Sequence, residues 1–485
     1  MPQHRIHVTR PVSETSIAES AELRHRFDAI RAELDVPAEF PPEVLAEARA
    51  AAASAGLPER DETAVPFLTI DPPGSMDLDQ AVHLEREGDG YRVRYAIADV
   101  PAFVRPGGAV DAEARRRGQT IYAPDRRTPL HPTELSEGAA SLLPGEVRPA
   151  FVWDLRTGSD GEVAAAEVYR ALVRSRERHD YAGVQQAVDN GSADERLMLL
   201  KELGEKRIEC ERRRGGASLP MPEQEVAEDE HGHYRLLFRP PLAAEDWNAQ
   251  ISLMTGMAAA AMMLEGGIGI LRTMPDPEHN AMGRFRRAAR GLGIEWPQDQ
   301  PYGEFLRSLD RTHPRHLALI HEATSLFRGA GYTAFDGAAP ERATHAAVAA
   351  AYAHVTAPLR RLVDRFGLVV CDSLSQGEDV PEWVREALPT LPEAMAVSDR
   401  RASAVERACA DAVEAAVLGD KVGQTFLASV VDLNGKGDRR QATVQVREPA
   451  VLARADGEAE LGSEVIVRLV EAEIATGTVR FAIQA

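Results

Sequence analysis

The hydrophobic periodicity of this 485-residue chain changes repeatedly, and the changes limit the folds it can adopt. Residues 15–55 carry a helical pattern in two segments, about 17–34 and 42–56, on either side of a proline-rich stretch. From residue 66 the pattern becomes strand-like. Long helical patterns then dominate 195–418, and the end of the chain alternates again. We therefore expect an α+β protein with more than one domain.

The pattern divides the chain into three expected parts. These are a helical N-terminal region over 1–60, a large α+β domain over 61–415, and a small OB-like β-barrel over 416–485. The large domain should have a mixed β core surrounded by helices. In it, AVHLE and YRVRYAIADV form an expected hairpin through the turn EGDG, and further strands are expected over 149–155 and 163–173. Helices are expected over 195–214, 245–265, 303–330, 358–376 and 390–418.

Composition excludes several classes of protein. A formal charge of −20 argues against a protein that coats nucleic acid nonspecifically, although a local basic channel would still serve a nucleic-acid enzyme. The cysteines Cys210, Cys371 and Cys409 lie far apart, so free buried thiols are expected. No window has the length of apolar sequence that a membrane helix needs, and we expect a cytoplasmic protein.

The stretch TIDPPGSMDLDQA at 69–81 concentrates three aspartates. The apolar run FLTI should bring Asp71 to the end of a strand, and the PPGS turn should return the chain. Asp77 and Asp79 then share one face of an extended segment, with Gln80 on the other. Carboxylates packed this closely suit Mg²⁺, whereas the alternative is a turn-rich loop whose acids cap backbone groups.

This stretch is the first in a series of ordered motifs that resemble the RNB catalytic domain of the ribonuclease II/R family. It is similar to the family pattern TIDPxxxxDxDDA and departs from it at Gln80, where a further aspartate is usual. The other matching stretches are YAIADVPAFV at 95–104, IYAPDRRTPLHPTELSEGAASLLPGEVRPA at 121–150, VRSRERHDYAGVQ at 173–185 and YAHVTAPLRRLVDR at 352–365. The resemblance covers roughly residues 65–375.

The resemblance implies roles for individual residues. Asp71, Asp77 and Asp79 would be the Mg²⁺-binding and catalytic acids, with Asp79 matching the most critical of them. Gln80 would still coordinate Mg²⁺ through its amide carbonyl. Because this ligand carries no charge, it would lower the affinity for the metal. Arg360 matches the arginine held against the scissile phosphate, and we expect it in the first turn of a helix beginning at Pro358. The alternative for Arg360 is a surface ion pair with Asp364.

Further residues would contact RNA by the same resemblance. Tyr122 matches an aromatic that stacks on bases, although a core tyrosine with a buried hydroxyl partner is an equal alternative. Arg272 is retained in a stretch, LRTM, that lacks the family's second base-gripping aromatic. Arg361 and His354 belong to the last motif, and His354 is more often structural in such a position than a general base. In the expected barrel, Lys436, Arg439 and Arg440 form a modest basic cluster.

The resemblance implies a Mg²⁺-dependent 3′→5′ exoribonuclease that hydrolyses single-stranded RNA to nucleoside 5′-monophosphates. Mn²⁺ would substitute for Mg²⁺, and no organic cofactor is expected. The chain would be a bacterial form without the family's N-terminal cold-shock-type domains, with the helical segment 1–60 in their place. The alternative is a catalytically weakened RNA-binding protein of the same fold, which Gln80 and the missing aromatic both favour.

Overall fold

The computed structural model describes residues 6–8, 21–219, 223–228, 234–239, 241–434 and 441–484. The first residues of the helix expected over 17–34, and the basic cluster of Lys436, Arg439 and Arg440, lie outside these ranges. Within them, no helix is long and apolar enough to cross a membrane. Cys210, Cys371 and Cys409 are free and buried, as expected.

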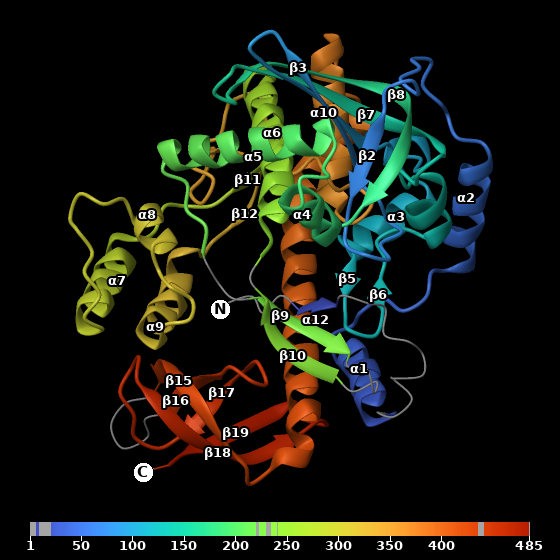
Figure 1. Ribbon diagram of the computed structural model, residues 1–485. Coiled ribbons are helices and arrows are strands. Elements are labelled where there is room, and N and C mark those ends of the chain that lie inside the picture. Colours follow the sequence, from blue (N-terminus) through green and yellow to red (C-terminus); the bar gives the residue numbers. More distant parts are fainter. Residues whose placement is uncertain are drawn as a thin grey trace.

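The first half of the chain is built around a closed β-barrel with the strand order β2-β3-β4-β7-β8 (Figure 1). Its strands are β2 (Phe67–Ile70), β3 (Gln80–Glu87), β4 (Gly90–Ala98), β7 (Val147–Thr157) and β8 (Val163–His179). The expected hairpin is confirmed, because β3 and β4 pair antiparallel up to Glu87 and Gly90. Gly88 in the turn has φ +62°, a conformation that glycine adopts without strain. The parallel pairing of β2 with β8 closes the barrel.

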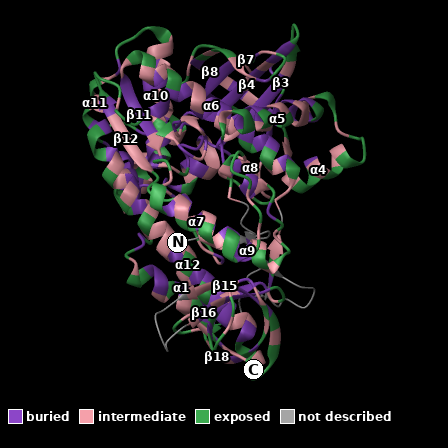
Figure 2. Cartoon of the chain, turned by 90° about the vertical axis from the view of Figure 1, so that its left-hand side faces the viewer, coloured by how far each residue is buried: buried purple, intermediate pink, exposed green. Residues whose placement is uncertain are grey.

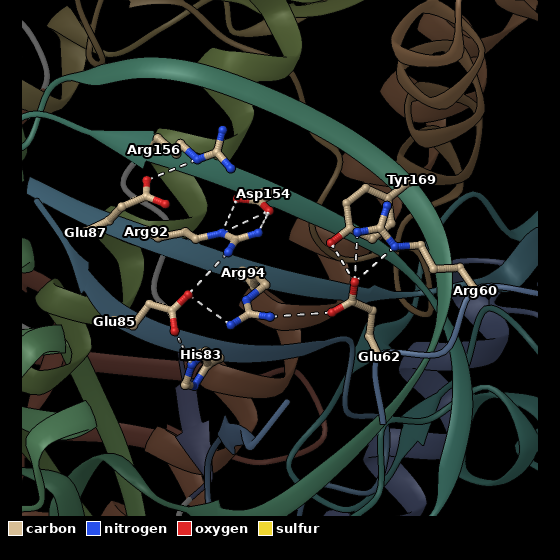
Figure 3. Close-up of polar contacts among 10 residues, drawn as sticks. All are labelled: Arg60, Glu62, His83, Glu85, Glu87, Arg92, Arg94, Asp154, Arg156 and Tyr169. Carbon is tan, nitrogen blue, oxygen red and sulfur yellow. Dashed lines mark hydrogen bonds and ion pairs between the residues drawn. The ribbon is translucent and has the colours of Figure 1, made fainter. Parts of the chain in front are cut away.

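The charged residues on one face of the barrel neutralise one another across neighbouring strands (Figure 3). Arg92 on β4 pairs with Asp154 on β7, and Arg94 on β4 donates to Glu85 on β3 at 3.0 Å. Glu62 accepts from Arg60 and lies 3.5 Å from Arg94. Cross-strand pairs of opposite charge stabilise a sheet by a few tenths of a kcal/mol to about 1 kcal/mol each. This charged surface is therefore satisfied by the protein itself.

Helices cover the barrel and carry the chain onward. They are α3 (Ala109–Arg117), α4 (Tyr181–Asp189), α5 (Glu195–Arg214), α6 (Ala243–Gly266), α10 (Leu362–Gln376) and α11 (Glu382–Ala387). Between them lie the two-stranded sheets β5 (Ile121–Tyr122) with β6 (Arg127–Thr128), β11 (Ile268–Thr273) with β12 (Gly331–Asp336), and β13 (Thr344–His345) with β14 (Ala350–Ala351). Gly256 of α6 lets the chain before α10 approach closely, because a Cβ there would lie 2.2 Å from the Tyr352 ring and 2.6 Å from the Ala353 carbonyl oxygen.

Two helix predictions need correction. The helix expected over 303–330 is broken into α8 (Tyr302–Arg307) and α9 (Pro314–Ala323), because Pro314 begins a new helix whose first turn is capped by the His313 imidazole. The helix expected from Pro358 begins at Leu362 instead. A further helix, α7 (His279–Gly291), was not predicted as such.

The N-terminal region is not purely helical. Its helices α1 (Ala21–Glu33) and α2 (Pro42–Ala53) are confirmed, but β1 (Ile6–Val8) is a strand. It pairs parallel with β9 (Glu223–Glu228), which also pairs antiparallel with β10 (Tyr234–Arg239).

The long helix α12 (Leu391–Leu418) leads away from these elements to a second closed barrel (Figure 1). That barrel has the order β15-β16-β17-β19-β18 and consists of β15 (Thr425–Asn434), β16 (Gln441–Val446), β17 (Val451–Asp456), β18 (Glu464–Glu473) and β19 (Thr478–Ile483). The expected small barrel is thus confirmed. Phe27 of α1, Val405 of α12 and Phe481 of β19 belong to one apolar core, so α1 and the C-terminal barrel are both anchored on α12.

Candidate active site

The aspartate run enters the structure between β2 and β3. Asp71 directly follows β2, as the sequence predicts. The chain then turns at Pro72–Ser75, where the Ser75 N–H donates to the Pro72 carbonyl and Gly74 has φ +84°. Proline at the second position and a positive φ at the third are typical of a type II turn. The turn sends the chain back to Asp77 and Asp79.

Leu78 anchors the run between these two acids. Its side chain is fully buried, and its N–H donates to the Ser141 hydroxyl at 3.0 Å while its carbonyl accepts from Leu142. Ser141 also donates to the Met76 carbonyl at 2.6 Å. Leu78 points into the core, and the acids on either side of it, Asp77 and Asp79, reach Arg127 and Arg360. Ser141 therefore holds the acidic run in register.

Asp79 and Arg360 form the central contact of the site. The Arg360 Nε donates to Asp79 Oδ2 at 2.9 Å, and the Leu359 N–H donates to Asp79 Oδ1 at 2.7 Å. Asp79 is only 2% exposed, and burial raises the pKa of Asp79 to about 7 against the lowering effects of Arg360 and the Leu359 amide. The Arg360 side chain is 44% exposed. Asp79 thus fixes the guanidinium through Nε, and the remaining N–H groups of Arg360 can bind a ligand.

Arg360 stands in a turn rather than in the first turn of a helix. Its N–H donates to the Ala357 carbonyl, and its own carbonyl accepts from Thr120. The alternative pairing with Asp364 is wrong for Arg360, because Arg361 makes that ion pair, with distances of 2.8 and 2.7 Å.

Asp77 is held by residues of the 121–150 motif. Arg127 donates to Asp77 Oδ1 at 2.7 Å and also pairs with Glu137 at 2.6 Å. The Tyr122 hydroxyl lies 3.3 Å from Asp77 Oδ2. Tyr122 is 50% exposed, so the alternative of a core tyrosine is wrong. Its ring is available for stacking directly beside the acids.

Asp71 differs from Asp77 and Asp79 in forming no ion pair with a described residue. Its Oδ2 is buried and makes no hydrogen bond to a described residue. Burial raises the pKa of Asp71 to about 7, with Arg360 opposing the shift and Asp77 reinforcing it. A buried carboxylate oxygen without a donor is costly for the folded protein and suits a cationic ligand.

Gln80 is tied into the protein at both ends of its amide. Its Nε2 donates to the Thr356 carbonyl at 2.6 Å, and its Oε1 accepts from the Tyr95 hydroxyl at 2.7 Å. Tyr95 also contacts the Ser252 hydroxyl at 2.8 Å. Gln80 therefore links the start of β3 to α6 and to the segment that carries Arg360.

The remaining predicted RNA-contacting residues form a second group. The Arg272 guanidinium lies 4.5 Å from the centre of the Tyr332 ring, and the Tyr332 hydroxyl is 2.7 Å from His354 Nδ1. Leu271, at the position of the missing aromatic, is fully buried. Burial and the charges of Arg361 and Arg272 lower the pKa of His354 well below its usual value. His354 thus has a structural partner in Tyr332, and Arg361 is engaged by Asp364.

Comparison with known proteins identifies the family. The RNB domain matches residues 59–368, and the RNase II-type exonuclease C-terminal S1 domain matches residues 424–484. The chain belongs to the RNB family. It is 28% identical to ribonuclease R of Escherichia coli K12 over 401 residues, covering 77% of this chain and 48% of that protein. The chain spans about half the length of this relative.

Solved structures share the fold of this RNB-family chain. Mycoplasma genitalium RNase R in complex with ribose-methylated single-stranded RNA matches with a TM-score of 0.86 at 18% identity, covering 96% of this chain and 78% of that one. Yeast Ssd1, described as a pseudonuclease, matches with a TM-score of 0.69 at 17% identity, covering 92% of this chain and 58% of that one. The match of residues 424–484 identifies the second barrel as an S1 domain, which is consistent with the OB-like barrel expected from the sequence.

Several further residues contact the candidate site, and the sequence alone did not single them out. Arg127 lies in PDRRTP, within the family-like stretch 121–150, so this motif could have identified it. Ser141 likewise lies in a quoted motif. Tyr95, Ser252 and Thr356 carry no local signal, because their contacts with Gln80 and with one another are made only in the folded chain.

In this arrangement, arginines balance two of the three acids. Arg127 pairs with Asp77 and Arg360 pairs with Asp79. Among the described residues, no three His, Cys, Asp or Glu side chains converge closely enough to hold a metal ion. The assignment of Asp71, Asp77, Asp79 and Gln80 as metal ligands stays a prediction. The unpartnered oxygen of Asp71 is the observation that fits a cation there.

The raised pKa of Asp71 predicts a pH-dependent stability. The unfolded pKa of an aspartate is about 3.9 and the folded value is about 7, so the uncharged carboxyl favours folding and its ionisation opposes it. This contribution is fully present below about pH 4 and is lost as the pH rises through about 7. Asp71→Asn stays uncharged. The stability of this variant relative to wild type should therefore increase by roughly 2–4 kcal/mol between about pH 4 and pH 8.

Urea unfolding of both proteins in chelator, followed across this pH range, measures the difference. A relative stability that does not change with pH would show that Asp71 is not the desolvated acid described above.

Proposed function

We propose that the protein is a 3′→5′ exoribonuclease that hydrolyses single-stranded RNA and releases nucleoside 5′-monophosphates. The observation that carries the proposal is the contact between Asp79 and the half-exposed Arg360, beside Asp71, Asp77 and Tyr122. The RNB match and the relatives named ribonuclease R support it.

Each residue of the site has a proposed task in this reaction. Arg360 is fixed by Asp79 through Nε and presents its remaining N–H groups to a non-bridging phosphate oxygen, where a guanidinium stabilises developing negative charge. Tyr122 stacks on a base near the 3′ end. Water attacks the phosphorus that joins the last two nucleotides, and the bond from this phosphorus to the 3′ oxygen breaks. The released nucleotide keeps the phosphate on its 5′ oxygen, and a proton from the water gives the shortened RNA its 3′ hydroxyl.

Mg²⁺, with Mn²⁺ as a substitute, is the proposed cofactor. Asp71, Asp77 and Asp79 would hold it, since hard carboxylate oxygens suit such cations and one buried oxygen of Asp71 has no donor among the described residues. When bound, the cation would supply activation of water and stabilisation of the leaving oxygen. Arg127 and Arg360 would then remain to neutralise the acids and orient the phosphate.

A second candidate function is RNA binding with weakened catalysis. Gln80 replaces a charged family residue, and both ends of its amide are engaged by Tyr95 and Thr356. The similarity to yeast Ssd1, a pseudonuclease, gives this candidate a precedent of fold. Because Asp71, Asp77, Asp79 and Arg360 are all retained, we favour the active enzyme.

An RNA degradation assay separates the two functions. Purified protein is incubated with 5′-labelled single-stranded RNA and Mg²⁺ or Mn²⁺, with EDTA as one control and Asp79→Asn as another. Asp89→Asn is the control for Asp79→Asn, because it makes the same substitution at an exposed aspartate in the β3–β4 turn. We expect stepwise shortening from the 3′ end that both EDTA and Asp79→Asn abolish and that Asp89→Asn retains. Intact RNA with a gel shift would support the second function, and full activity of Asp79→Asn would refute the assignment of the site.

The role of Tyr122 can be tested separately from its hydroxyl. Loss of one stacked base corresponds to roughly 1–3 kcal/mol, so Tyr122→Ala should raise KM for RNA by about 5- to 150-fold. Tyr122→Phe keeps the ring and should remain close to wild type. Steady-state kinetics on single-stranded RNA measures both. An equal loss in the two variants would show that the hydroxyl near Asp77, rather than the ring, is what matters.

A further inference from the structure

The helices α7, α8 and α9 form a module with its own apolar core and no part in the site described above. Phe285, Phe305 and Ile320 are buried in this core. The module lies between the catalytic part and the C-terminal barrel (Figures 1 and 2). Helix α9 packs against β15, and Arg447 of the barrel donates to the Thr312 carbonyl just before α9. The module therefore bridges the two halves of the molecule.

The polar face of α7 is rich in arginine. Its buried residues Ala281, Phe285 and Ala289 follow each other at helical spacing and face the core of the module. The opposite face carries Arg284, Arg286, Arg287 and Arg290. No ion pair joins any of these four to another described residue, whereas the arginines of the barrel face in Figure 3 are paired with acids. In a chain of net charge −20, four arginines on one helix that form no ion pair with a described residue favour an anionic partner.

One of these arginines extends an aromatic stack from the core to the surface. The rings of Phe305 and Trp296 are parallel within 5°, with their centres 4.5 Å apart. The Arg286 guanidinium lies 3.8 Å from the centre of the Trp296 ring. Phe305 is buried, and Trp296 and Arg286 are half-buried, so the stack runs from the core to the surface of the module. It ends in a planar cation that can receive another flat group.

A cavity of about 520 Å³ opens beside this stack. It is lined by Arg286, Arg290, Ile294, Glu295, Trp296 and Gln298, among others. The lining offers two guanidinium groups, an indole and an amide, with Glu295 as its one acid. These groups match a nucleotide, because arginines bind phosphate, amides hydrogen-bond base edges and planar groups stack on bases.

We propose that the α7 face and this cavity bind single-stranded RNA on the 5′ side of the segment held in the active site. A base would stack on Arg286 over Trp296, and Arg290 would contact a neighbouring phosphate. Arg284 and Arg287 extend the positive surface along the helix. The proposal rests on the proposed function, since a 3′ end bound near Arg360 leaves the 5′ portion outside. The module would then hold long RNA on the enzyme between successive cleavages.

The test compares two variants of equal charge. Arg286→Gln/Arg290→Gln removes the cavity arginines, and Arg24→Gln/Arg407→Gln removes two exposed arginines of α1 and α12. Both are made in the Asp79→Asn background so that RNA stays intact, and circular dichroism and thermal unfolding check the fold. Fluorescence anisotropy gives Kd for labelled single-stranded RNAs of increasing length at several salt concentrations. Labelled poly-aspartate is titrated in parallel as a probe for an acidic protein partner.

The cavity variant should raise Kd for long RNA about tenfold and leave the shortest RNA unaffected. The slope of log affinity against log salt should fall by about 0.7 for each phosphate that the variant no longer neutralises. The α1/α12 variant should match its parent in both respects. Equal Kd and salt slope in the two variants would overturn the proposal. So would a cavity variant that binds poly-aspartate more weakly but binds RNA as its parent does.

Failure of the proposed function would look different. If the wild-type protein degrades no RNA but long-RNA affinity still depends on Arg286 and Arg290, the RNA-binding module stands and the exonuclease does not. If RNA is degraded normally and the cavity variant has unchanged affinity and salt dependence, the exonuclease stands and the module does not.

Discussion

The buried carboxylate of Asp79 is the point on which the site depends. It accepts hydrogen bonds from Leu359 and Arg360, which lie 280 and 281 residues further along the chain. These two bonds join the loop after β2 to the turn before α10. A buried charge is tolerated only when it is paired and hydrogen-bonded, so removing Arg360 would leave the buried Asp79 carboxylate with an uncompensated desolvation cost. This contact orients the Arg360 guanidinium, while hydrogen bonds of the Arg360 backbone with Ala357 and Thr120 fix its place in the chain.

Charged side chains are paired to different extents in three parts of the molecule. On the barrel face, arginines and acids such as Arg92 and Asp154 satisfy one another and contribute to structure. In the site, a buried oxygen of Asp71 accepts no hydrogen bond from the part of the chain that the structure describes, and ionisation of this carboxyl opposes folding. A buried carboxylate that opposes folding is typical of a binding or catalytic site, where function is gained at the expense of stability. On α7, Arg286 and Arg290 form no ion pair with a described residue.

The sequence predicts local features well where a short-range pattern determines them. The β3–β4 hairpin follows from alternation and a glycine turn, and the small C-terminal barrel follows from repeated alternation. The start of α10 was misplaced, because the Asp364 carboxylate accepts from the Ala357 N–H and holds Pro358 in a turn instead of a helix. The family motifs bring Asp79 and Arg360 to notice, but the contacts of Gln80 with Tyr95 and Thr356 depend on distant segments meeting in space.

A double-mutant cycle measures the contact that joins the two segments. Urea unfolding in chelator gives the free energies of the wild type, Asp79→Asn, Arg360→Gln and the double variant. If Asp79 and Arg360 interact as described, the coupling energy should be roughly 1.5–3 kcal/mol, as for hydrogen bonds to charged groups. Free energies that add to within about 0.5 kcal/mol would show that the two residues stabilise the protein independently, and would contradict the proposed organisation of the site.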